Sequence, residues 1–350
     1  MARLKVASLF CGCGGMDLGI LGGFDFLGVS YPRSAFDIVY AVDNDAYCTK
    51  IYNANFEHKC QVKDVREIIP EQMPDFDLLV GGFPCQSFSI SAQNPPRLGF
   101  KDERGMLFFE MVKILKTKKP RAFIAENVKG LLSANNKQAF PMILKEFSEA
   151  GYHVQYHLVN ASKFGVPQKR ERVIIVGFQD ERDEAMFKFC CLNSASAVLG
   201  DVIDESENQN ESLFFSDKAV AGMMAVRDKM NKGRVQKLDE PCNTISAHLA
   251  KVSLNSTDPV LMIGDRYRRF SCREAARIQS FPDSFVLDCV SSIRQYKAIG
   301  NAVPPVMMWH IANSVQRAFE KTDGQYDDAL ADVRVRYAYS HKASQGCLFD

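Results

Sequence analysis

The sequence lacks the features that mark membrane and secreted proteins. No apolar run within its 350 residues is long enough to span a lipid bilayer. The first ten residues, MARLKVASLF, lack the long apolar core and the cleavage site of a secretory signal. These absences exclude a membrane-embedded chain and predict a cytoplasmic protein with no membrane partner.

The spacings of disulfide frameworks and metal sites are also missing. The eleven cysteines include no C-x-x-C pair and follow no disulfide-like spacing. Cys190 and Cys191 are adjacent and cannot easily share one tetrahedral metal, and the only close histidines, His153 and His157, lie in an alternating, strand-like stretch. We therefore expect no bound metal and mostly buried, hydrophobic cysteines.

A large net charge is absent as well, because 43 lysines and arginines stand against 42 aspartates and glutamates. Net charge therefore gives no sign of a nucleic-acid-binding protein. The positive charges are nevertheless clustered in KTKKPR at 116–121, QKRER at 168–172 and RYRR at 266–269. Each cluster alone is typical of a solvated face, whereas three together leave room for a basic groove.

The first half of the chain alternates short apolar runs with helix-like segments. Strands are predicted at 5–10, 36–43, 76–82, 122–127 and 172–178, with a further strand ending near Asp64 and a pairing partner for the last one in HVQYHLVNA. Helices are predicted at 45–55, 105–118 and 138–150. This alternation predicts an α/β fold with a doubly wound, mostly parallel sheet.

Residues suited to binding or catalysis follow the predicted strands. They are Gly12, Asp43, Asp64, Cys85 and Glu126, in chain order. Ligands of doubly wound sheets bind beyond the carboxyl ends of the strands. Because core packing does not account for five such positions, we expect a ligand site along this edge.

The pattern changes after Phe178. The stretch 179–265 is irregular and contains a polar, acidic run at 204–212, which predicts an exposed loop. Helix-like patterns return at 271–281 and at 306–319. We therefore divide the chain into a larger domain, a smaller inserted domain, a return to the larger domain and a tail, at 1–180, 181–290, 291–325 and 326–350.

The segment SLFCGCGGMDLG predicts a tight turn at the start of a helix. Gly12, Gly14 and Gly15 follow the first strand directly and allow a ligand to approach the backbone. The nicotinamide-binding pattern G-x-G-x-x-G requires a third glycine at the position that Asp17 occupies. The turn therefore favours a nucleotide-like ligand and disfavours NAD.

Two acidic positions indicate what that ligand is. Asp43, at the end of the second strand, suits the hydroxyl groups of a ribose. Asp64 can accept a hydrogen bond from an adenine amino group, and Val65 can pack on the ring. Each acid alone is as readily a helix cap. Together they fit adenosine without a pyrophosphate, which predicts S-adenosylmethionine.

Cys85 follows a proline at the end of an apolar run and precedes a long loop rich in serine, glycine and proline. Glu126 ends the next strand, and Arg170 and Arg172 alternate before another, so that both point the same way. A thiolate nucleophile needs nearby positive charge or a base. The four side chains suit a flat heterocycle: cysteine attacks a ring carbon, glutamate protonates a ring nitrogen and an arginine binds the carbonyl.

With these motifs in place, the sequence resembles the DNA cytosine carbon-5 methyltransferases, bacterial restriction–modification type, from about Lys5 to Phe319. The shared motifs, in order, are FxGxGG, GFPCQSFS, ENV, QKRER, RRFSCREAARIQSFPDSF and GNAVPP. The resemblance implies the fold of S-adenosylmethionine-dependent methyltransferases. It also implies transfer of a methyl group to carbon-5 of a flipped-out cytosine in a short, specific double-stranded DNA sequence, with S-adenosylhomocysteine as product.

The resemblance also implies residue roles. Cys85 is expected to attack carbon-6, Glu126 to engage ring N3 and the exocyclic amine, and Arg172 to contact the carbonyl, with Arg170 as its active-site neighbour. Positions expected around the cofactor are Phe10, Gly12, Gly14, Gly15, Asp43, Asn44, Asp64, Val65, Leu107, Asn301 and Ala302. Positions expected to meet DNA are Ser87, Arg104 and Thr244.

The irregular stretch occupies the place of the family's target recognition domain, and LDEPCNTISAH at 238–248 resembles a recurring core of that domain. Departures from the family pattern are small. Asp43 stands where glutamate is commoner, Cys11 replaces a usual serine, and an extra segment around 30–35 lengthens the first crossover.

Three other functions fit the sequence less well. The same chemistry on transfer RNA is disfavoured because the second domain has no Cys-Phe-Thr element. A DNA-binding protein without catalysis is disfavoured by the intact Cys85, Glu126 and Arg172 set, and a nicotinamide oxidoreductase by Asp17. We expect a monomer that protects host DNA, with a cognate restriction endonuclease as a candidate partner.

Overall fold

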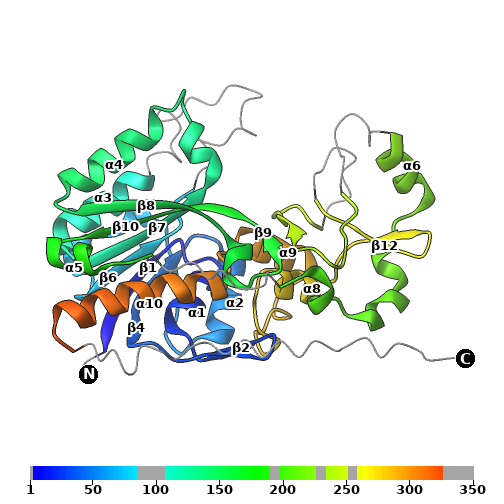
Figure 1. Ribbon diagram of the computed structural model, residues 1–350, viewed down its shortest axis with the longest axis horizontal. Coiled ribbons are helices and arrows are strands. Elements are labelled where there is room, and N and C mark those ends of the chain that lie inside the picture. Colours follow the sequence, from blue (N-terminus) through cyan, green and yellow to red (C-terminus); the bar gives the residue numbers. More distant parts are fainter. Residues whose placement is uncertain (1–2, 85–106, 190–196, 226–233, 251–257, 326–350) are drawn as a thin grey trace, which may run out of the picture.

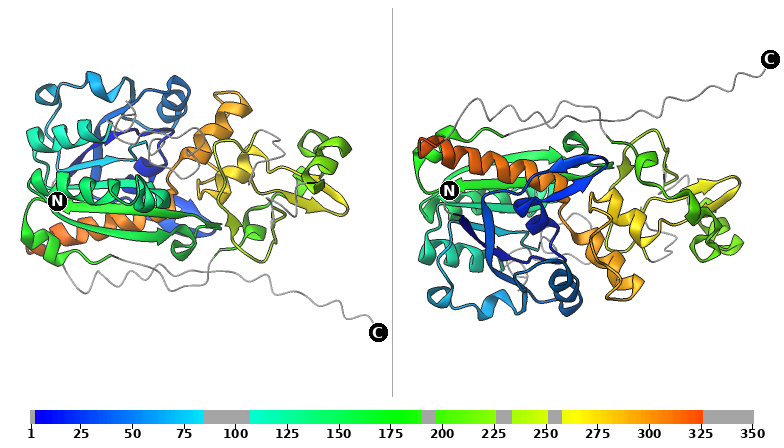
Figure 2. Two further views of the ribbon diagram at one scale, coloured as in Figure 1. Left: turned by 90° about the horizontal axis from the view of Figure 1, so that it is seen from above. Right: turned by 90° about the horizontal axis from the view of Figure 1, so that it is seen from below.

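The computed structural model describes residues 3–84, 107–189, 197–225, 234–250 and 258–325. Within these ranges the chain forms two lobes, a larger one built on a sheet and a smaller one with few regular elements (Figure 1). Figure 2 shows, from above and below, that the smaller lobe extends from one end of the sheet. The predicted ligand edge of the sheet therefore faces the second lobe.

The larger lobe contains a seven-stranded sheet in the order β5-β4-β1-β6-β7-β10-β8. Its strands are β1 (Leu4–Leu9), β4 (Phe36–Asp43), β5 (Gln61–Val62), β6 (Leu78–Gly81), β7 (Ala122–Val128), β8 (His153–Asn160) and β10 (Glu171–Phe178). The five strands from β5 to β7 are parallel, and β10 runs antiparallel to β7 and β8. The predicted doubly wound, mostly parallel sheet is confirmed, including the pairing of HVQYHLVNA with the strand at 172–178.

Helices cover both faces of the sheet (Figure 1). They are α1 (Gly15–Leu21), α2 (Ala46–Asn55), α3 (Leu107–Lys118), α4 (Ala139–Glu149) and α10 (Pro305–Thr322). The short helix α5 (Glu181–Met186) packs against α10. Successive strand residues serve opposite faces: Val6 packs in the core beneath α1 and α10, while Ala7 packs in the core beneath α3 and α4. The central strands are thus buried between two apolar cores, and this packing fixes the positions of their ends.

One pair of strands was missed in the sequence. The segment expected only to lengthen the first crossover begins on the second strand of a hairpin, which consists of β2 (Phe24–Phe26) and β3 (Val29–Tyr31). Tyr31 stacks on Phe24 and meets the ring of Trp309 edge-on. The hairpin thus fastens α10 to the first crossover, although each of its strands is too short to give a periodic signal.

The smaller lobe contains helices α6 (Asp217–Ala225) and α8 (Cys272–Ile278) and the short strands β11 (Cys242–Asn243), β12 (Leu261–Ile263) and β13 (Arg266–Arg268), while β9 (Gln168–Lys169) and α9 (Ser292–Asn301) lie where the two lobes meet (Figure 1). The acidic run is mostly exposed, as expected, but forms two short 3-10 turns at Glu205–Gln209 and Glu211–Leu213. A fully buried ion pair, Arg268 to Glu274 at 2.8 Å, joins β13 to α8. Glu274 also completes a capping box with Ser271.

Candidate active site

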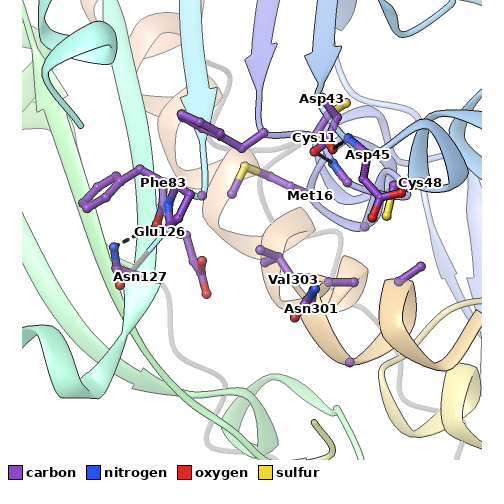
Figure 3. A pocket seen from close by; sticks show the side chains of 18 of the residues that line it. Cys11, Met16, Asp43, Asp45, Cys48, Phe83, Glu126, Asn127, Asn301 and Val303 are labelled. Carbon is purple, nitrogen blue, oxygen red and sulfur yellow. Dashed lines mark hydrogen bonds between the residues drawn. The ribbon is translucent and has the colours of Figure 1, made fainter. Parts of the chain in front are cut away.

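A cavity of about 390 Å³ lies beyond the carboxyl ends of β1, β4, β6 and β7. Figure 3 shows Phe83, Glu126 and Asn127 on one side of the cavity, the residues around Asp43 on the other, and Val303 and Asn301 apart from both groups. The cavity brings together most of the residues predicted from the sequence. These are Phe10, Gly12, Gly15, Asp43, Asn44, Glu126, Arg170, Arg172, Asn301 and Ala302.

The turn after β1 shapes one wall of the cavity. Gly14 has a φ of 94°, and a Cβ atom placed on it would lie 2.2 Å from the Phe56 ring, so both conformation and space require glycine. Phe10 also has a left-handed backbone, with a φ of 55°. Such strain in a non-glycine residue is commonly found at functional sites. The Gly12 amide donates to Asp43 Oδ2 at 2.8 Å, which ties the turn to the end of β4.

Asp43 offers an acceptor to this cavity. Its Oδ1 accepts from the Asp45 amide at 2.8 Å, and its Oδ2 accepts from Gly12. Burial raises the pKa of Asp43, although these two backbone donors act in the opposite direction. A carboxylate has about four acceptor sites, so two remain for a ligand. This free capacity beside a backbone cradle fits the paired hydroxyl groups of an adenosine ribose.

An ion pair that sequence reasoning missed borders the same side. Lys297 of α9 lies 2.6 Å from Asp45 Oδ2 at the start of α2, and both residues line the cavity. Burial alone would raise the pKa of Asp45, but the hydrogen bond from Lys297 helps to hold it below its usual value. In the sequence, Asp45 looks like a helix N-cap, which it also is. Nothing in the sequence signals its partner 252 residues away.

Glu126 and Arg172 form the charged end of the cavity. Glu126 lies near the carboxyl end of β7, and Arg172 lies on the adjoining strand β10, where Arg172 is the register partner of Val128. Arg172 Nε lies 2.7 Å from Glu126 Oε1, and the two side chains are only 10% and 12% exposed. A carboxyl group and a guanidinium group held together here can bind the donor and acceptor edge of one heterocycle.

Asn127 connects this end of the cavity to the segment before Cys85. Its side chain is buried and donates from Nδ2 to the Phe83 carbonyl at 3.1 Å (Figure 3). Gly82, Phe83 and Pro84 line the cavity, so the chain leads into it directly ahead of Cys85. Cys85, Ser87 and Arg104 themselves lie outside the described residues.

Arg170 does not lie beside Arg172 as a second donor to a ligand, as the sequence predicted. It lines the cavity, but its guanidinium donates to the carbonyls of Ile245, Gly300 and Ala302 at 3.0 to 3.2 Å. Burial and the neighbouring charge of Arg172 lower the pKa of Arg170 well below its usual value. The contacts make Arg170 a link between the two lobes at the rim of the cavity.

Five other predicted positions do not line the cavity in the described chain. Gly14 lies in the turn behind it, Asp64 caps a 3-10 turn and pairs with Arg66 at 2.7 Å, and Val65 is buried in the core under α3. Leu107 begins α3 and packs on the same core. Thr244 is exposed and donates from Oγ1 to the Lys169 carbonyl at 2.8 Å. Their expected roles stay predictions.

Asp17, the residue that disfavours a nicotinamide ligand, has a structural role. Asp17 is fully buried and accepts hydrogen bonds from Ser8 Oγ at 2.6 Å and from the Tyr52 hydroxyl at 2.8 Å. Burial raises its pKa to about 6. Its carboxyl group faces inward to the protein, beneath the glycine turn.

The cysteines follow expectation where they are described. Cys11, Cys13, Cys48, Cys60 and Cys242 are free and buried. Cys11 Sγ lies 3.1 Å from Cys60 Sγ, and burial raises the pKa of Cys11 well above its usual value. Among the described residues no group of three or more histidine, cysteine, aspartate or glutamate side chains could hold a metal ion. In that same part of the chain, no helix is long and apolar enough to cross a membrane.

The three basic clusters do not form one groove. Arg121, in the first cluster, immediately precedes β7, at the end of the strand opposite to the cavity, and pairs with Asp183 and Asp323. Arg268, in the third, is buried against Glu274. The second cluster, 168–172, supplies both cavity arginines. Of the three clusters, only the second therefore borders the cavity.

The sheet order and the cavity define the class of protein, a methyltransferase-type α/β enzyme. The methyltransferase EhMeth of Entamoeba histolytica has the same fold, with a TM-score of 0.71 at 17% identity over 92% of this chain and 99% of its own. The family described as C-5 cytosine-specific DNA methylase matches residues 4–317. The chain belongs to this family and is a DNA cytosine-5 methyltransferase.

Two relatives have similar lengths. The Type II methyltransferase M.FnuDI of Fusobacterium nucleatum is 34% identical over 339 residues, which cover 89% of this chain and 94% of the relative. The Type II methyltransferase M.Bsp6I of a Bacillus species is 31% identical over 327 residues, covering 90% and 99%. The family resemblance seen in the motifs is thus confirmed over nearly the whole chain.

Proposed function

We propose that this enzyme transfers a methyl group from S-adenosylmethionine to carbon-5 of a flipped-out cytosine within one short double-stranded DNA sequence. We infer that it does so as the modification enzyme of a type II restriction–modification system, as a cytoplasmic monomer beside a cognate endonuclease. The names of the relatives support the biological setting. The observation that carries the chemistry is the Glu126–Arg172 pair next to the chain segment that leads to Cys85.

The side chains at this end divide the work on the base. The Cys85 thiolate adds to carbon-6, and Glu126 supplies a proton at ring N3, so that the electron pair of the broken double bond becomes available at carbon-5. Arg172 orients Glu126 and donates to the ring carbonyl. After methyl transfer, a base removes the carbon-5 proton, the double bond re-forms and the Cys85 thiolate leaves. Because ring atoms are inaccessible inside a duplex, the cytosine must leave the stack.

The opposite side of the cavity suits the methyl donor. Asp43 and the Gly12 turn fit the ribose, Phe10, Asn44 and Gly15 fit the surrounding adenosine, and Asn301 and Ala302 close the wall. Bound there, S-adenosylmethionine supplies an electrophilic methyl group and leaves as S-adenosylhomocysteine. We also expect Gly14, Asp64, Val65 and Leu107 to support the cofactor from outside this wall. No metal is needed for the reaction.

The smaller lobe is proposed to choose the DNA sequence. Residues 1–180 and 291–325 then form the catalytic domain and 181–290 the target recognition domain, with Thr244, Ser87 and Arg104 as DNA contacts. Thr244 is exposed and bonded to the carbonyl of Lys169, the residue before Arg170, which supports a contact near the active site. The tail, 326–350, has no assigned role.

A methylation assay on a random library tests the function. Purified protein is incubated with S-adenosylmethionine and a plasmid library that carries a randomised insert, and 5-methylcytosine is located by bisulfite sequencing. The proposal predicts methylation of one cytosine within one short motif, and none with the Cys85→Ala variant. No 5-methylcytosine would overturn the proposed activity, and methylation without sequence preference would overturn the role in a restriction–modification system.

A further inference from the structure

Two buried glutamines connect the smaller lobe to the wall of the cavity. Gln168 on β9 and Gln279 at the end of α8 are both fully buried. Gln168 Nε2 donates to Gln279 Oε1 at 2.5 Å and to the Ile278 carbonyl at 3.3 Å. Gln168 Oε1 accepts from the Ile245 amide at 3.0 Å. Every polar atom of the Gln168 side chain is therefore used inside the protein.

Gln279 continues this connection to the cavity. Its Nε2 donates to the carbonyls of Ile299 and Ala302, each at 2.8 Å. Ala302 lines the cavity and follows Asn301, which also lines it. The two carbonyl acceptors fix which way the Gln279 amide points, and this leaves its Oε1 for Gln168. The glutamine pair is thus an ordered link from Ile245 to the end of α9.

Arg170 forms a second connection between the same two segments. Its guanidinium holds the carbonyl of Ile245 on one side and those of Gly300 and Ala302 on the other. The amide and the carbonyl of Ile245 are therefore both held by side chains of residues 168–170. The side chain of Arg170 is only 2% exposed, which removes solvent as an alternative partner.

The same two segments also touch directly. A Cβ atom placed on Gly300 would lie 2.2 Å from the Ser246 carbonyl oxygen, so the end of α9 packs against the backbone of segment 244–247. Because no side chain separates the two backbones here, a shift of either segment toward the other would produce a clash. The connection between the two segments is therefore short, buried and closely packed.

We propose that Gln168 and Gln279 are positioning residues, through which segment 244–247 of the smaller lobe and the cofactor wall at Gly300–Ala302 hold each other in place. The inference rests on the proposed function, because it assigns segment 244–247 to DNA and the wall to the cofactor. Bound cofactor should order the wall and, through the link, segment 244–247, so that DNA binding becomes tighter. By linkage, bound DNA then tightens cofactor binding by the same factor. Neither glutamine touches the reacting atoms.

The test replaces Gln279 by methionine, which keeps the size and removes the hydrogen bonds. The carbonyls of Ile299 and Ala302 would then be left in a buried place without this donor, which is unfavourable. We therefore expect Gln279→Met to weaken S-adenosylhomocysteine binding about tenfold by calorimetry. We also expect the KM for S-adenosylmethionine to rise more than kcat falls. The matched control is Gln316→Met, which removes an α10 glutamine that accepts a hydrogen bond from the Ala35 amide. In this control the affinity for S-adenosylhomocysteine and the KM for S-adenosylmethionine should stay unchanged.

A second readout reports the coupling itself. The affinity for a fluorescein-labelled duplex that carries the methylated motif is measured by anisotropy with and without S-adenosylhomocysteine. In the wild type the product should tighten DNA binding, and in Gln279→Met this tightening should largely disappear. Gln168→Met together with Gln279→Met should do little more than either alone, because the two residues share one hydrogen bond.

The outcomes separate this inference from the proposed function. A folded Gln279→Met variant with wild-type product affinity and coupling overturns the positioning role, as does a loss confined to kcat. Gln279→Asn, which keeps the amide but shortens its reach, replaces the methionine variant if that variant does not fold, and the same two results decide. A wild-type protein that binds neither product nor DNA overturns the proposed function instead.

Discussion

The two lobes are held together by different interactions. In the larger lobe, strands such as β6 and β10 bury nearly every side chain between two helical layers, so apolar packing sets the position of each strand end. In the smaller lobe the strands are two or three residues long, and buried polar links such as Arg268–Glu274 add to the packing of apolar residues such as Phe270. The smaller lobe therefore depends on individual polar contacts as well as on its buried apolar residues.

The largest effect is expected in the larger lobe, at Cys85. Cys85→Ala should abolish methylation because no other group can form the bond to carbon-6. Binding of the duplex should persist, since the change removes one sulfur atom. Methylation is measured with tritiated S-adenosylmethionine and DNA binding by anisotropy. Retained turnover would remove Cys85 from the mechanism.

Glu126 should rank second. Removing the proton donor to ring N3 should lower kcat by about 10² to 10⁴-fold. Glu126→Gln keeps the shape of the side chain, so product binding measured by calorimetry should not change. Glu171→Gln is the matched control, because Glu171 lies on the neighbouring strand and pairs with Lys129 at the surface. Equal losses in the two variants would contradict a specific role for Glu126.

In the smaller lobe, the largest loss of stability is expected when the buried Arg268–Glu274 ion pair is broken. Arg268→Met leaves Glu274 buried without its partner, which typically costs about 3–5 kcal/mol. We expect a lower unfolding temperature and faster proteolysis within residues 197–289. Arg266, two residues earlier on β13, pairs with Glu211 at the surface, so Arg266→Met should change both measurements little. Similar results for the two variants would show that burial of the pair does not matter.

The smallest effect expected lies beneath the glycine turn, at Asp17. Burial raises its pKa from 3.8 to about 6, so the folded protein binds the proton more tightly than the unfolded chain. Stability from this group is therefore complete below about pH 4 and is lost as pH rises through 6, by up to about 3 kcal/mol. Wild type should gain stability relative to Asp17→Asn as pH falls from 7 to 5, measured by denaturant unfolding. A constant difference across this range would contradict the shifted pKa.

The contrast between the lobes also explains how far the sequence could be interpreted. Strands such as 36–43 and 122–127 were predicted within a residue or two because their apolar runs are continuous and end in polar residues. For the same reason, Gly12, Asp43 and Glu126 were placed correctly at one edge of the sheet. Strand ends converge wherever a parallel sheet forms, so local pattern was sufficient.

Other features depend on contacts between distant residues, which leave no periodic trace. Lys297 reaches Asp45 across 252 residues, and Gln168 reaches Gln279 across 111. In neither pair does the sequence around one residue indicate the other as its partner. The 3-10 turns of the smaller lobe are likewise fixed by side-chain caps such as Asp204 rather than by hydrophobic spacing. Such links became visible only with the fold in hand.

The most direct test of the covalent mechanism is to trap its intermediate. The protein is incubated with S-adenosylmethionine and duplex DNA that contains 5-fluorocytosine, digested, and examined by mass spectrometry for an adducted peptide. Because fluorine cannot be removed as a proton is, the enzyme should stall with the base bonded to Cys85. An adduct on another residue, or one formed on fluorinated RNA and not on DNA, would contradict the account.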